Sequence, residues 1–306
     1  MVNDEPTTDA RVPGDEATIT LACAQIEPRV GEVEHNRART VEAIEDAVER
    51  GADFVILPEL ANSGYVFDSR SEARACAEPI PSGETARRWK ELAVEHGVYV
   101  VGGYAELDGA DVYNSSVFVG PDGFIGAQRK LHLWNEEKLW FEPGEEIRVF
   151  KTPVGRVGIQ ICYDQWFPEM SRIQAQQGAD LIVEPTNWVP TTEREQAGEL
   201  GEDELARANH LAVSNAHVNT VWFACADRVG VERGSEFLGR SLILDPDGEP
   251  VAGPASRNEE EIVLAECNLA DARRKKTWND YNGVPSDRRT DVYGEMLGYD
   301  ADAHPF

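Results

Sequence analysis

The sequence predicts one α/β domain in which two β-sheets pack face to face and helices cover their outer sides. Expected strands outnumber expected helices, and the helices alternate with pairs of strands. No boundary linker, solenoid-type repeat or low-complexity core segment divides the 306 residues. With 41% apolar residues, the chain can build the sizeable core that such a layered domain requires.

The first half of the chain alternates between strands and helices. Alternating apolar residues predict the strands, and Val41, Ile44 and Val48 lie at the spacing of a helix. In order, the predicted elements are a strand over 18–25, a helix over 33–50, a strand over 53–57, a helix over 83–96 and a strand over 98–103. A hairpin follows, with strands over 113–119 and 124–129 around the turn Gly120-Pro121-Asp122-Gly123.

A long loop over residues 130–146 precedes the second half, and long ordered loops in compact domains are often functional. The next predicted elements are a strand over 157–161, a helix over 169–177, a strand over 179–183, a helix over 202–213 and a strand over 221–226. A second hairpin turns at Asp245-Pro246-Asp247-Gly248, and the last strand covers 261–267.

The two ends of the chain are predicted to lie outside this domain, which we place at residues 17–270. Residues 1–16 are polar and acidic, with two prolines, and predict a disordered tail. Residues 271–306 form a polar C-terminal tail that carries Trp278, Tyr281 and Tyr293. Because a polar tail with interspersed aromatic rings often docks on a neighbouring surface, we expect this tail to lie at a subunit interface.

The net charge of −27 restricts the partners of the protein. A surface this acidic repels nucleic acid and anionic membranes, so neither is an expected partner. Only six of the 29 basic residues are lysine, and acidic, lysine-poor surfaces are typical of proteins from a salt-rich cytoplasm. Salt there screens the self-repulsion of the charges. Ordinary solubility is the alternative explanation.

The lack of a recognisable targeting signal and the spacing of the cysteines favour a cytoplasmic protein. No apolar stretch approaches the length of a membrane span, and the first residues lack the basic and apolar regions of a signal peptide. The five cysteines are Cys23, Cys76, Cys162, Cys225 and Cys267, and no two form a Cys-x-x-Cys pair. This spacing fits neither a disulfide framework nor a zinc site, so we expect reduced thiols.

Cys162 stands where a nucleophile is useful. An apolar strand ending at Ile161 stops at the thiol, and Pro168-Glu169 predicts a helix start a few residues later. A thiol at a sharp strand-to-helix turn is held rigidly at the edge of a sheet, as nucleophilic catalysis requires. The alternative is a small buried core cysteine, which is the commoner fate of a free thiol.

Three charged residues are candidates to assist this thiol. Glu59 ends a strand, at the edge where α/β proteins keep their sites, and beside a thiol it could act as a general base. Lys130 ends the hairpin, where its ammonium could stabilise charge on a reacting carbonyl oxygen. Glu137 could position Lys130 or an attacking water, although Glu136 and Glu142 fit the same spacing. Ordinary surface or capping roles are the alternatives for each of them.

The order and contexts of these residues resemble the nitrilase superfamily of carbon–nitrogen hydrolases, over roughly residues 18–285. The matching segments are Leu57-Pro58-Glu59-Leu60, Arg129-Lys130-Leu131-His132, Trp140-Phe141-Glu142-Pro143-Gly144, Gly158-Ile159-Gln160-Ile161-Cys162-Tyr163-Asp164, Ala226-Asp227-Arg228-Val229-Gly230 and Phe237-Leu238-Gly239-Arg240-Ser241. No single segment is decisive, but three catalytic contexts in the right order are highly specific.

The resemblance implies a four-layer α-β-β-α sandwich and a Glu-Lys-Cys triad carried by Glu59, Lys130 and Cys162, with Glu137 as the family's second glutamate. It implies that Lys130 and the backbone N–H of Tyr163 stabilise the oxyanion, and that ammonia leaves a cysteine thioester that water then hydrolyses. No metal or organic cofactor is implied. Subunits of the family usually pair, so a homodimer or a higher even homo-oligomer is expected, with the helix after Cys162 and the C-terminal tail at the contact.

The resemblance leaves the substrate open among small amides, carbamoyl compounds and nitriles. The chain is similar both to archaeal-type nitrilases and to carbamoylputrescine amidase-like members. Tyr65, Trp134, Asn187 and Trp188 are candidates for the substrate pocket, although Trp188 could equally serve packing. The Glu-rich segment 191–204 could favour a cationic substrate, or it could be a solvated loop.

Other hypotheses compete with this one. The protein could be a true nitrilase acting on aliphatic nitriles, or a non-catalytic binding protein that keeps the fold. A histidine-assisted cysteine hydrolase would use His132, His210 or His217, although no papain-like or caspase-like context surrounds Cys162. A glutaminase subunit would need a separate synthetase partner.

Overall fold

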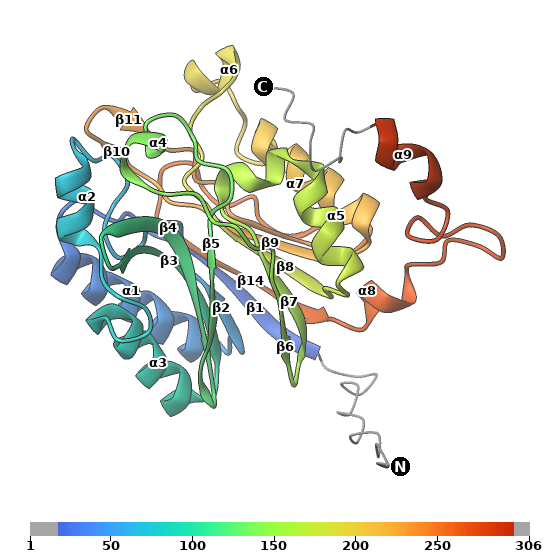
Figure 1. The fold of residues 1–306 in the computed structure, drawn as a ribbon, viewed down its shortest axis with the longest axis horizontal. Helices are drawn as coiled ribbons and strands as arrows, with labels where there is room; N and C mark the ends of the chain where they lie inside the picture. The colour runs from blue at the N-terminus through green and yellow to red at the C-terminus, as the bar shows by residue number, and fades with distance from the viewer. Residues whose placement is uncertain (1–17, 297–306) are drawn as a thin grey trace, which may run out of the picture.

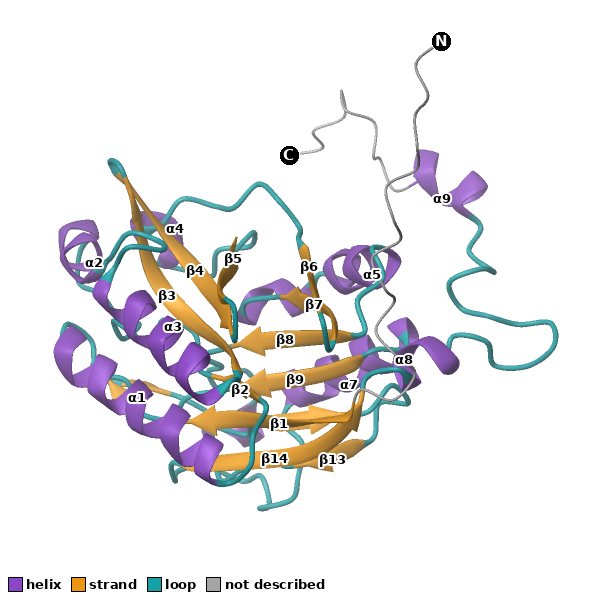
Figure 2. Cartoon of the chain, turned by 90° about the horizontal axis from the view of Figure 1, so that it is seen from below, coloured by secondary structure: helices purple, strands orange, loops and turns teal. Residues whose placement is uncertain are grey.

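The structure, a computed structural model, describes residues 18–296 as four stacked layers: helices, sheet, sheet and helices (Figures 1 and 2). The layered α/β fold predicted from the sequence is therefore confirmed. The tail predicted over residues 1–16 lies outside the described residues, as does the end of the C-terminal tail from residue 297 onward.

The first sheet has the strand order β14-β1-β2-β3-β4-β5. Its central strands β1, β2 and β3 run parallel, and the outer strands are antiparallel to their neighbours. The strands are β1 (Thr18–Gln25), β2 (Phe54–Ile56), β3 (Tyr99–Asp108), β4 (Asp111–Gly120), β5 (Gly123–Arg129) and β14 (Glu261–Asn268).

The second sheet repeats this plan in the order β13-β12-β9-β8-β7-β6. Here β7, β8 and β9 are the parallel centre, and antiparallel strands again flank them. The strands are β6 (Val149–Thr152), β7 (Gly155–Ile159), β8 (Leu181–Pro185), β9 (Trp222–Ala226), β12 (Leu242–Leu244) and β13 (Pro250–Ala252). In each sheet, an antiparallel hairpin that turns at Pro-Asp-Gly extends one edge (β4–β5 and β12–β13).

Helices cover the outer face of each sheet. On the first sheet lie α1 (Val33–Glu49) and α3 (Glu84–His96), and on the second lie α5 (Pro168–Gln176) and α7 (Arg207–Asn219) (Figure 1). The shorter elements are α2 (Arg70–Cys76), α4 (Glu137–Trp140), the 3-10 helix η1 (Cys162–Trp166), α6 (Glu193–Gln196), the hairpin β10 (Val231–Glu232) and β11 (Ser235–Glu236), α8 (Asp271–Arg274) and α9 (Thr290–Met296).

The alternation of side chains along each strand builds the core in layers. Within β2, Phe54 and Ile56 pack between the sheets together with Val157 of β7, whereas Val55 packs under the outer helices. Successive residues of a strand point to opposite faces, so one short strand serves two apolar layers. This arrangement fixes both sheets rigidly and leaves the ends of their strands to carry polar groups.

One predicted helix is wrong in position. Residues 202–213 were expected to be helical, but α7 covers Arg207–Asn219. The Arg240 guanidinium donates to the carbonyl oxygens of Gly201 and Glu202 and holds that segment outside the helix. The side chain of Asn209 accepts the N–H of Ala206 at the true start of the helix.

Four other elements, β3, β6, α2 and α4, differ from the prediction. The strand predicted over 98–103 continues to Asp108, because β4 pairs along the whole length of β3. Neither β6 nor α2 is predicted from the sequence, since β6 forms an edge strand against β7 and α2 caps a small apolar cluster beside β3. The expected loop over residues 130–146 contains the single-turn helix α4.

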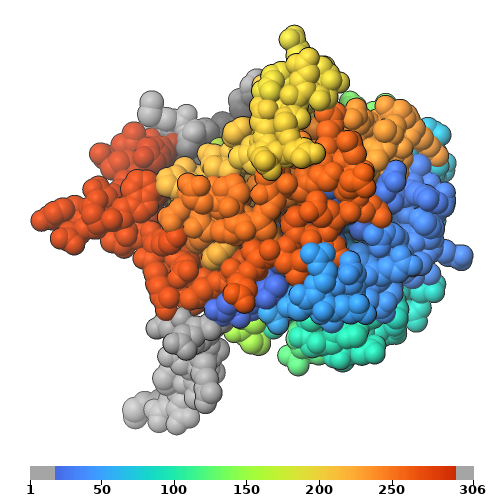
Figure 3. All heavy atoms as spheres, turned by 180° about the vertical axis from the view of Figure 1, so that it is seen from behind, coloured from blue at the N-terminus to red at the C-terminus, as the bar shows by residue number. Residues whose placement is uncertain are grey.

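The described part of the C-terminal tail leaves the body of the molecule after α8. Residues 275–289 extend outward to α9 and form a protrusion in the space-filling view (Figures 1 and 3). Trp278 is 56% and Tyr281 90% exposed there. Among residues 18–296, no helix combines the length and apolar character needed to cross a membrane.

Candidate active site

The predicted site residues lie where strands of both sheets end. Glu59 follows β2 and Cys162 follows β7, and both strands belong to the parallel centres of their sheets. Asn187, just after β8, donates from Nδ2 to the backbone oxygen of Glu59 at 3.0 Å and so joins the two sheets. Lys130 directly follows β5. The fold therefore gathers these side chains at one edge, as open α/β sheets commonly do.

A buried ammonium lies between two carboxylates. Lys130 Nζ donates to Oε1 of Glu59 and to Oε1 of Glu137, at 2.7 Å each. Asn114 of β4 donates from Nδ2 to the same oxygen of Glu59, also at 2.7 Å. The side chains of Lys130, Glu59 and Glu137 are 0%, 0% and 3% exposed. Oε2 of Glu59 is left as a buried oxygen that no described group hydrogen-bonds.

The structure distinguishes Glu137 from Glu136 and Glu142, which fit the same spacing in the sequence. Three donors hold it: Lys130 and the Tyr65 hydroxyl bond to Oε1, the latter at 2.6 Å, and the N–H of Trp134 bonds to Oε2 at 3.1 Å. Glu142 instead forms an ion pair with Arg70 at 2.9 Å. Glu136 is exposed at the rim of a cavity. Glu137 is thus the second glutamate that the fold brings to Lys130.

Cys162 lies on a strained backbone turn. Its φ is +49°, a left-handed conformation that costs free energy for any residue except glycine and that recurs at functional sites. Asp164 pins the turn, because Oδ2 accepts the N–H of Ile161 at 3.1 Å and Oδ1 accepts the N–H of His132 at 3.0 Å. The N–H of Tyr163 opens η1, where a helix offers no internal acceptor, so it can serve a ligand oxygen.

Burial and two carboxylates determine the charges in the cluster. Burial acts to lower the pKa of Lys130, but Glu137 and Glu59 outweigh it and hold this pKa well above its ordinary value of 10.5, so the ammonium stays charged. Burial raises the pKa of Glu137 to about 7, against the opposing effect of Lys130. The charge of Glu59 acts in the same direction as burial.

The resting state of Cys162 is a thiol. Burial, and then the charge of Glu59, raise its pKa well above the ordinary value of 9.0, although Lys130 acts in the opposite direction. A buried thiol of this kind becomes a nucleophile only if a base takes its proton during attack. Within the described residues, Oε2 of Glu59 is a carboxylate oxygen of the same buried cluster that has no hydrogen-bond partner.

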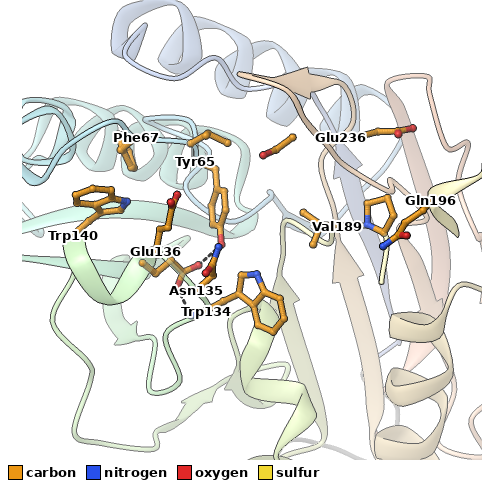
Figure 4. Close-up of a pocket in the computed structure, with 13 residues that line it drawn as sticks. Tyr65, Phe67, Trp134, Asn135, Glu136, Trp140, Val189, Gln196 and Glu236 are labelled. Atoms are coloured by element: carbon orange, nitrogen blue, oxygen red, sulfur yellow. Dashed lines mark hydrogen bonds between the residues drawn. The ribbon is translucent and has the colours of Figure 1, made fainter. Parts of the chain in front are cut away.

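Two adjoining cavities open over the cluster. The larger has a volume of about 360 Å³ (Figure 4). Its wall includes Tyr65, Trp134, Glu136, Glu137 and Glu236. The smaller, of about 30 Å³, contains Cys162 and holds little more than one water molecule. Trp134 and Val189 line both cavities, so the two adjoin at these side chains.

All four predicted pocket residues border these cavities. Tyr65 and Trp134 line the larger one, and Trp134, Asn187 and Trp188 line the smaller one. Trp188 is also only 4% exposed and packs in the outer core of the second sheet, so both interpretations of this residue apply. The Glu-rich segment 191–204 contributes Gln196 rather than a carboxylate to the larger cavity.

The histidines have other contacts. His132 lies with Nδ1 2.8 Å from Asp164 Oδ1 and stacks on Phe167, and His217 Nδ1 meets the backbone oxygen of Asp247 at 2.9 Å. His210 is exposed. Within the described structure none of the three hydrogen-bonds the thiol. Across residues 18–296, no group of three or more His, Cys, Asp or Glu side chains is arranged to hold a metal ion.

Sequence reasoning missed two residues that shape the site. Asn114 bonds to Glu59, and its signal was a polar amide inside the apolar strand that ends at Val119. Asp164 clamps the turn at Cys162, and its signal was a carboxylate two residues after the candidate nucleophile. Both residues are fully buried, a location in which charged and amide side chains usually have hydrogen-bond partners.

Comparisons with known proteins find similar sequences and structures that cover most of the chain. The sequence profile of the family described as carbon-nitrogen hydrolase matches residues 20–277. A nitrilase of Pyrococcus abyssi is 41% identical over 276 residues, covering 90% of this chain and 99% of that protein. An N-carbamoylputrescine amidase of Solanum lycopersicum is 31% identical, covering 93% and 95%. Nit3 of Saccharomyces cerevisiae, a nitrilase superfamily member of known structure, superposes with a TM-score of 0.74 at 27% identity, covering 87% of this chain and 96% of that one.

Proposed function

The chain belongs to the carbon–nitrogen hydrolase family, and from that premise we propose that it hydrolyses a small amide, carbamoyl compound or nitrile through a thioester on Cys162. Glu59 serves as the general base and acid, Lys130 as the electrophilic cation, and Glu137 as the carboxylate that orients Lys130. The observation that carries the proposal is the buried cluster itself. It combines a protonated thiol, a fixed cation and one unsatisfied carboxylate oxygen.

Acylation begins with proton transfer from the thiol. Oε2 of Glu59 takes the proton while Sγ of Cys162 bonds to the substrate carbon, and the C=O electron pair moves onto oxygen. Lys130 Nζ and the N–H of Tyr163 stabilise this oxyanion. Glu59 then gives the proton to the substrate nitrogen, the C–N bond breaks, and ammonia leaves a thioester. A nitrile first gives a thioimidate, which takes up one further water before ammonia departs.

Hydrolysis of the thioester reverses the proton path. A water molecule gives one proton to Glu59 as its oxygen bonds to the acyl carbon, and the C–S bond breaks. The proton returns to sulfur, and the acid is released. For an amide, one water is consumed and one ammonia is formed in each cycle. The fixed ammonium of Lys130 serves both halves of the cycle, because its pKa is held high by the two carboxylates.

Ammonia release from a panel of small nitriles, amides and N-carbamoyl amines, in molar salt, tests the proposal, with Cys162→Ala as the control. We expect the wild type to release ammonia and Cys162→Ala to release none while keeping its circular dichroism spectrum. The exchange removes one buried sulfur, which costs little stability. Release from nitriles alone would identify a nitrilase, and release from amides or carbamoyl compounds would identify an amidase.

Two results would contradict the proposed function. Turnover that persists in Cys162→Ala would rule out a thioester on this residue. No release by a folded wild-type protein, across the panel, would favour a non-catalytic binding protein with this fold. A thioester mass added to Cys162 on brief exposure to substrate would be direct support, and Glu59→Gln should slow its removal.

The walls of the larger cavity favour an uncharged or cationic substrate. Glu136 and Glu236 contribute carboxylates to the wall, no Lys, Arg or His is among the described residues that line it, and Trp134 and Trp140 add aromatic faces. Aromatic faces beside carboxylates attract an ammonium and repel a carboxylate. Within the panel, N-carbamoyl amines with a free ammonium should therefore have a lower KM than N-carbamoyl amino acids. Equal KM values would remove this preference.

We also propose that the subunits assemble as a homodimer or a higher even oligomer. The protruding segment after α8 supports this, because it exposes Trp278 and Tyr281 on an otherwise acidic molecule. Light scattering coupled to gel filtration measures the mass directly. Truncation after residue 274 should lower that mass if the segment holds the subunits together.

A further inference from the structure

A buried ion pair outside the triad connects the mouth of the site to Glu137. Arg228 Nη1 lies 3.1 Å from Oε1 of Glu232, and the two side chains are 1% and 6% exposed. Arg228 also donates to the backbone oxygen of Pro28 at 2.6 Å and lies over the ring of Phe237, 4.2 Å from its centre. These contacts hold Arg228 beside the hairpin β10–β11, whose first strand contains Glu232.

The second oxygen of Glu232 holds the loop that follows the general base. Oε2 accepts the N–H of Tyr65 at 2.8 Å and the N–H of Val66 at 2.7 Å. This loop leaves the site at Glu59 and returns to it at Tyr65, whose ring packs edge-on against Phe237. A carboxylate that accepts two backbone N–H groups fixes the backbone more firmly than a neutral acceptor does.

Tyr65 passes this restraint on to the site. Its hydroxyl donates to Oε1 of Glu137, the same oxygen that accepts from Lys130. Burial and the charges of Glu137 and Glu59 hold the pKa of Tyr65 well above 10, so the hydroxyl keeps its proton and remains a donor. The connection therefore runs from Arg228 to Glu232, to the backbone and then the hydroxyl of Tyr65, and finally to Glu137.

We propose that Glu232 is a positioning residue of the reaction: by holding the backbone of Tyr65, it places the hydroxyl that keeps Glu137 against Lys130. This inference rests on the proposed hydrolase function and adds a residue that touches neither the thiol nor the substrate carbon. Glu232 lies on the first strand of a hairpin whose second strand, Ser235–Glu236, lines the larger cavity. Substrate contact at that hairpin is thereby linked mechanically to Glu137.

The first test removes the hydroxyl alone. Tyr65→Phe keeps the ring that lines the cavity, so KM should stay within about threefold of the wild type. Loss of a hydrogen bond to a charged group should lower kcat roughly ten- to a hundredfold. Because the Tyr65 hydroxyl helps to hold the pKa of Glu137 down, the acidic limb of the rate profile should also move to higher pH. The other titratable groups that interact with Glu137 are Lys130, Glu59 and Cys162.

A matched pair of double variants tests Glu232 without leaving a buried charge unpaired. Arg228→Met/Glu232→Gln keeps an oxygen that can accept the two N–H groups, and Arg228→Met/Glu232→Leu does not. We expect the first to retain most of kcat and the second to lose as much as Tyr65→Phe, per active site counted by alkylation of Cys162. Adding Tyr65→Phe to the second should lower kcat no further, because both changes act through one contact.

The control breaks an exposed tether of the same hairpin. Glu72 pairs with Arg233 at 2.6 Å on the surface, and Glu72→Gln should leave kcat unchanged. Wild-type kcat in Tyr65→Phe, or equal kcat per site in the two double variants whatever their melting temperatures, would overturn the proposal and leave Glu232 with a structural role. The panel with Cys162→Ala decides the hydrolase function separately, so the two failures are distinguishable.

Discussion

Burial has a large effect on the protonation states of individual side chains in this protein. Lys130 remains an ammonium although no water reaches it, since Glu59 and Glu137 lie 2.7 Å from its nitrogen. Cys162, which is also buried and is affected by the same charges, remains a thiol. The contrast follows from desolvation, which penalises every charge that lacks a close opposite partner. Groups near the site that lack such a partner should therefore make stability depend on pH.

Glu184 is such a group. It is fully buried at the end of β8, and burial, followed by the charges of Asp164 and Glu59, raises its pKa well above 4.5. The folded state then keeps a proton that the unfolded state has released, so its contribution to stability is complete below pH 4.5 and is lost as the pH rises toward the folded-state pKa. Glu184→Gln should remove this loss and stabilise the protein more at pH 8 than at pH 5.

Urea unfolding at pH 5 and pH 8 measures this difference. The comparison is made between variant and wild type at each pH, so other groups with the same behaviour, such as Asp227, cancel. An equal change in the free energy of unfolding at both pH values would mean that Glu184 is ionised in the folded protein.

At the scale of elements, the approach of β3 to the loop after β2 fixes Glu59. A Cβ atom on Gly103 would lie 2.3 Å from Cα of Glu59, and a Cβ on Gly102 would meet the ring of Trp89. Only glycine permits this approach of one backbone to another. The position of the general base thus depends on a residue without a side chain in the neighbouring strand.

Gly103→Ala should therefore displace the loop and lower both stability and activity. Overpacking against backbone atoms that cannot move costs typically 1–3 kcal/mol, and a shifted base should reduce kcat/KM by about a hundredfold or more. Gly51→Ala is the control, because a Cβ there meets nothing within 4 Å and only the positive φ adds strain. Thermal unfolding and ammonia release measure the two effects. Normal activity in Gly103→Ala would show that the loop can relax.

The helices and strands also show how much of the fold could be predicted from the sequence. Period-two and helical spacing predicted the central strands and α1, α3 and α5, and the strand ends pointed to Glu59, Lys130 and Cys162. The helix over 202–213 failed because Arg240, far along the chain, binds the carbonyls that would have started it. The roles of Asn114, Asp164 and Glu232 could not be assigned from the sequence, since each side chain bonds to a group that the fold brings near.

At the scale of the whole molecule, the negative net charge has the largest influence on how stability depends on salt. The net charge of −27 places mutually repelling carboxylates over the surface. Added salt shortens the range of this repulsion from about 10 Å at 0.1 M to about 3 Å at 1 M. The folded state holds the charges closer together than the unfolded state, so salt should favour folding.

The melting temperature should accordingly rise between 0.1 M and 2 M KCl, as followed by circular dichroism. A control with Glu34→Lys, Glu249→Lys and Glu259→Lys, all at exposed positions, makes the net charge less negative and should respond less to salt. A flat or falling melting temperature in the wild type would mean that the acidic surface serves solubility alone.

The two sheets have equivalent plans, and this has an evolutionary consequence. Each has three parallel strands, one antiparallel neighbour on one side and a Pro-Asp-Gly hairpin on the other, with two helices outside. A gene duplication that fused two copies of one ancestral unit would yield this plan. The reactive groups do not follow it, because Glu59 and Lys130 come from the first half and Cys162 from the second. Neither half holds the full set alone, so in such a history the reactive set would have been completed only after the two units were fused.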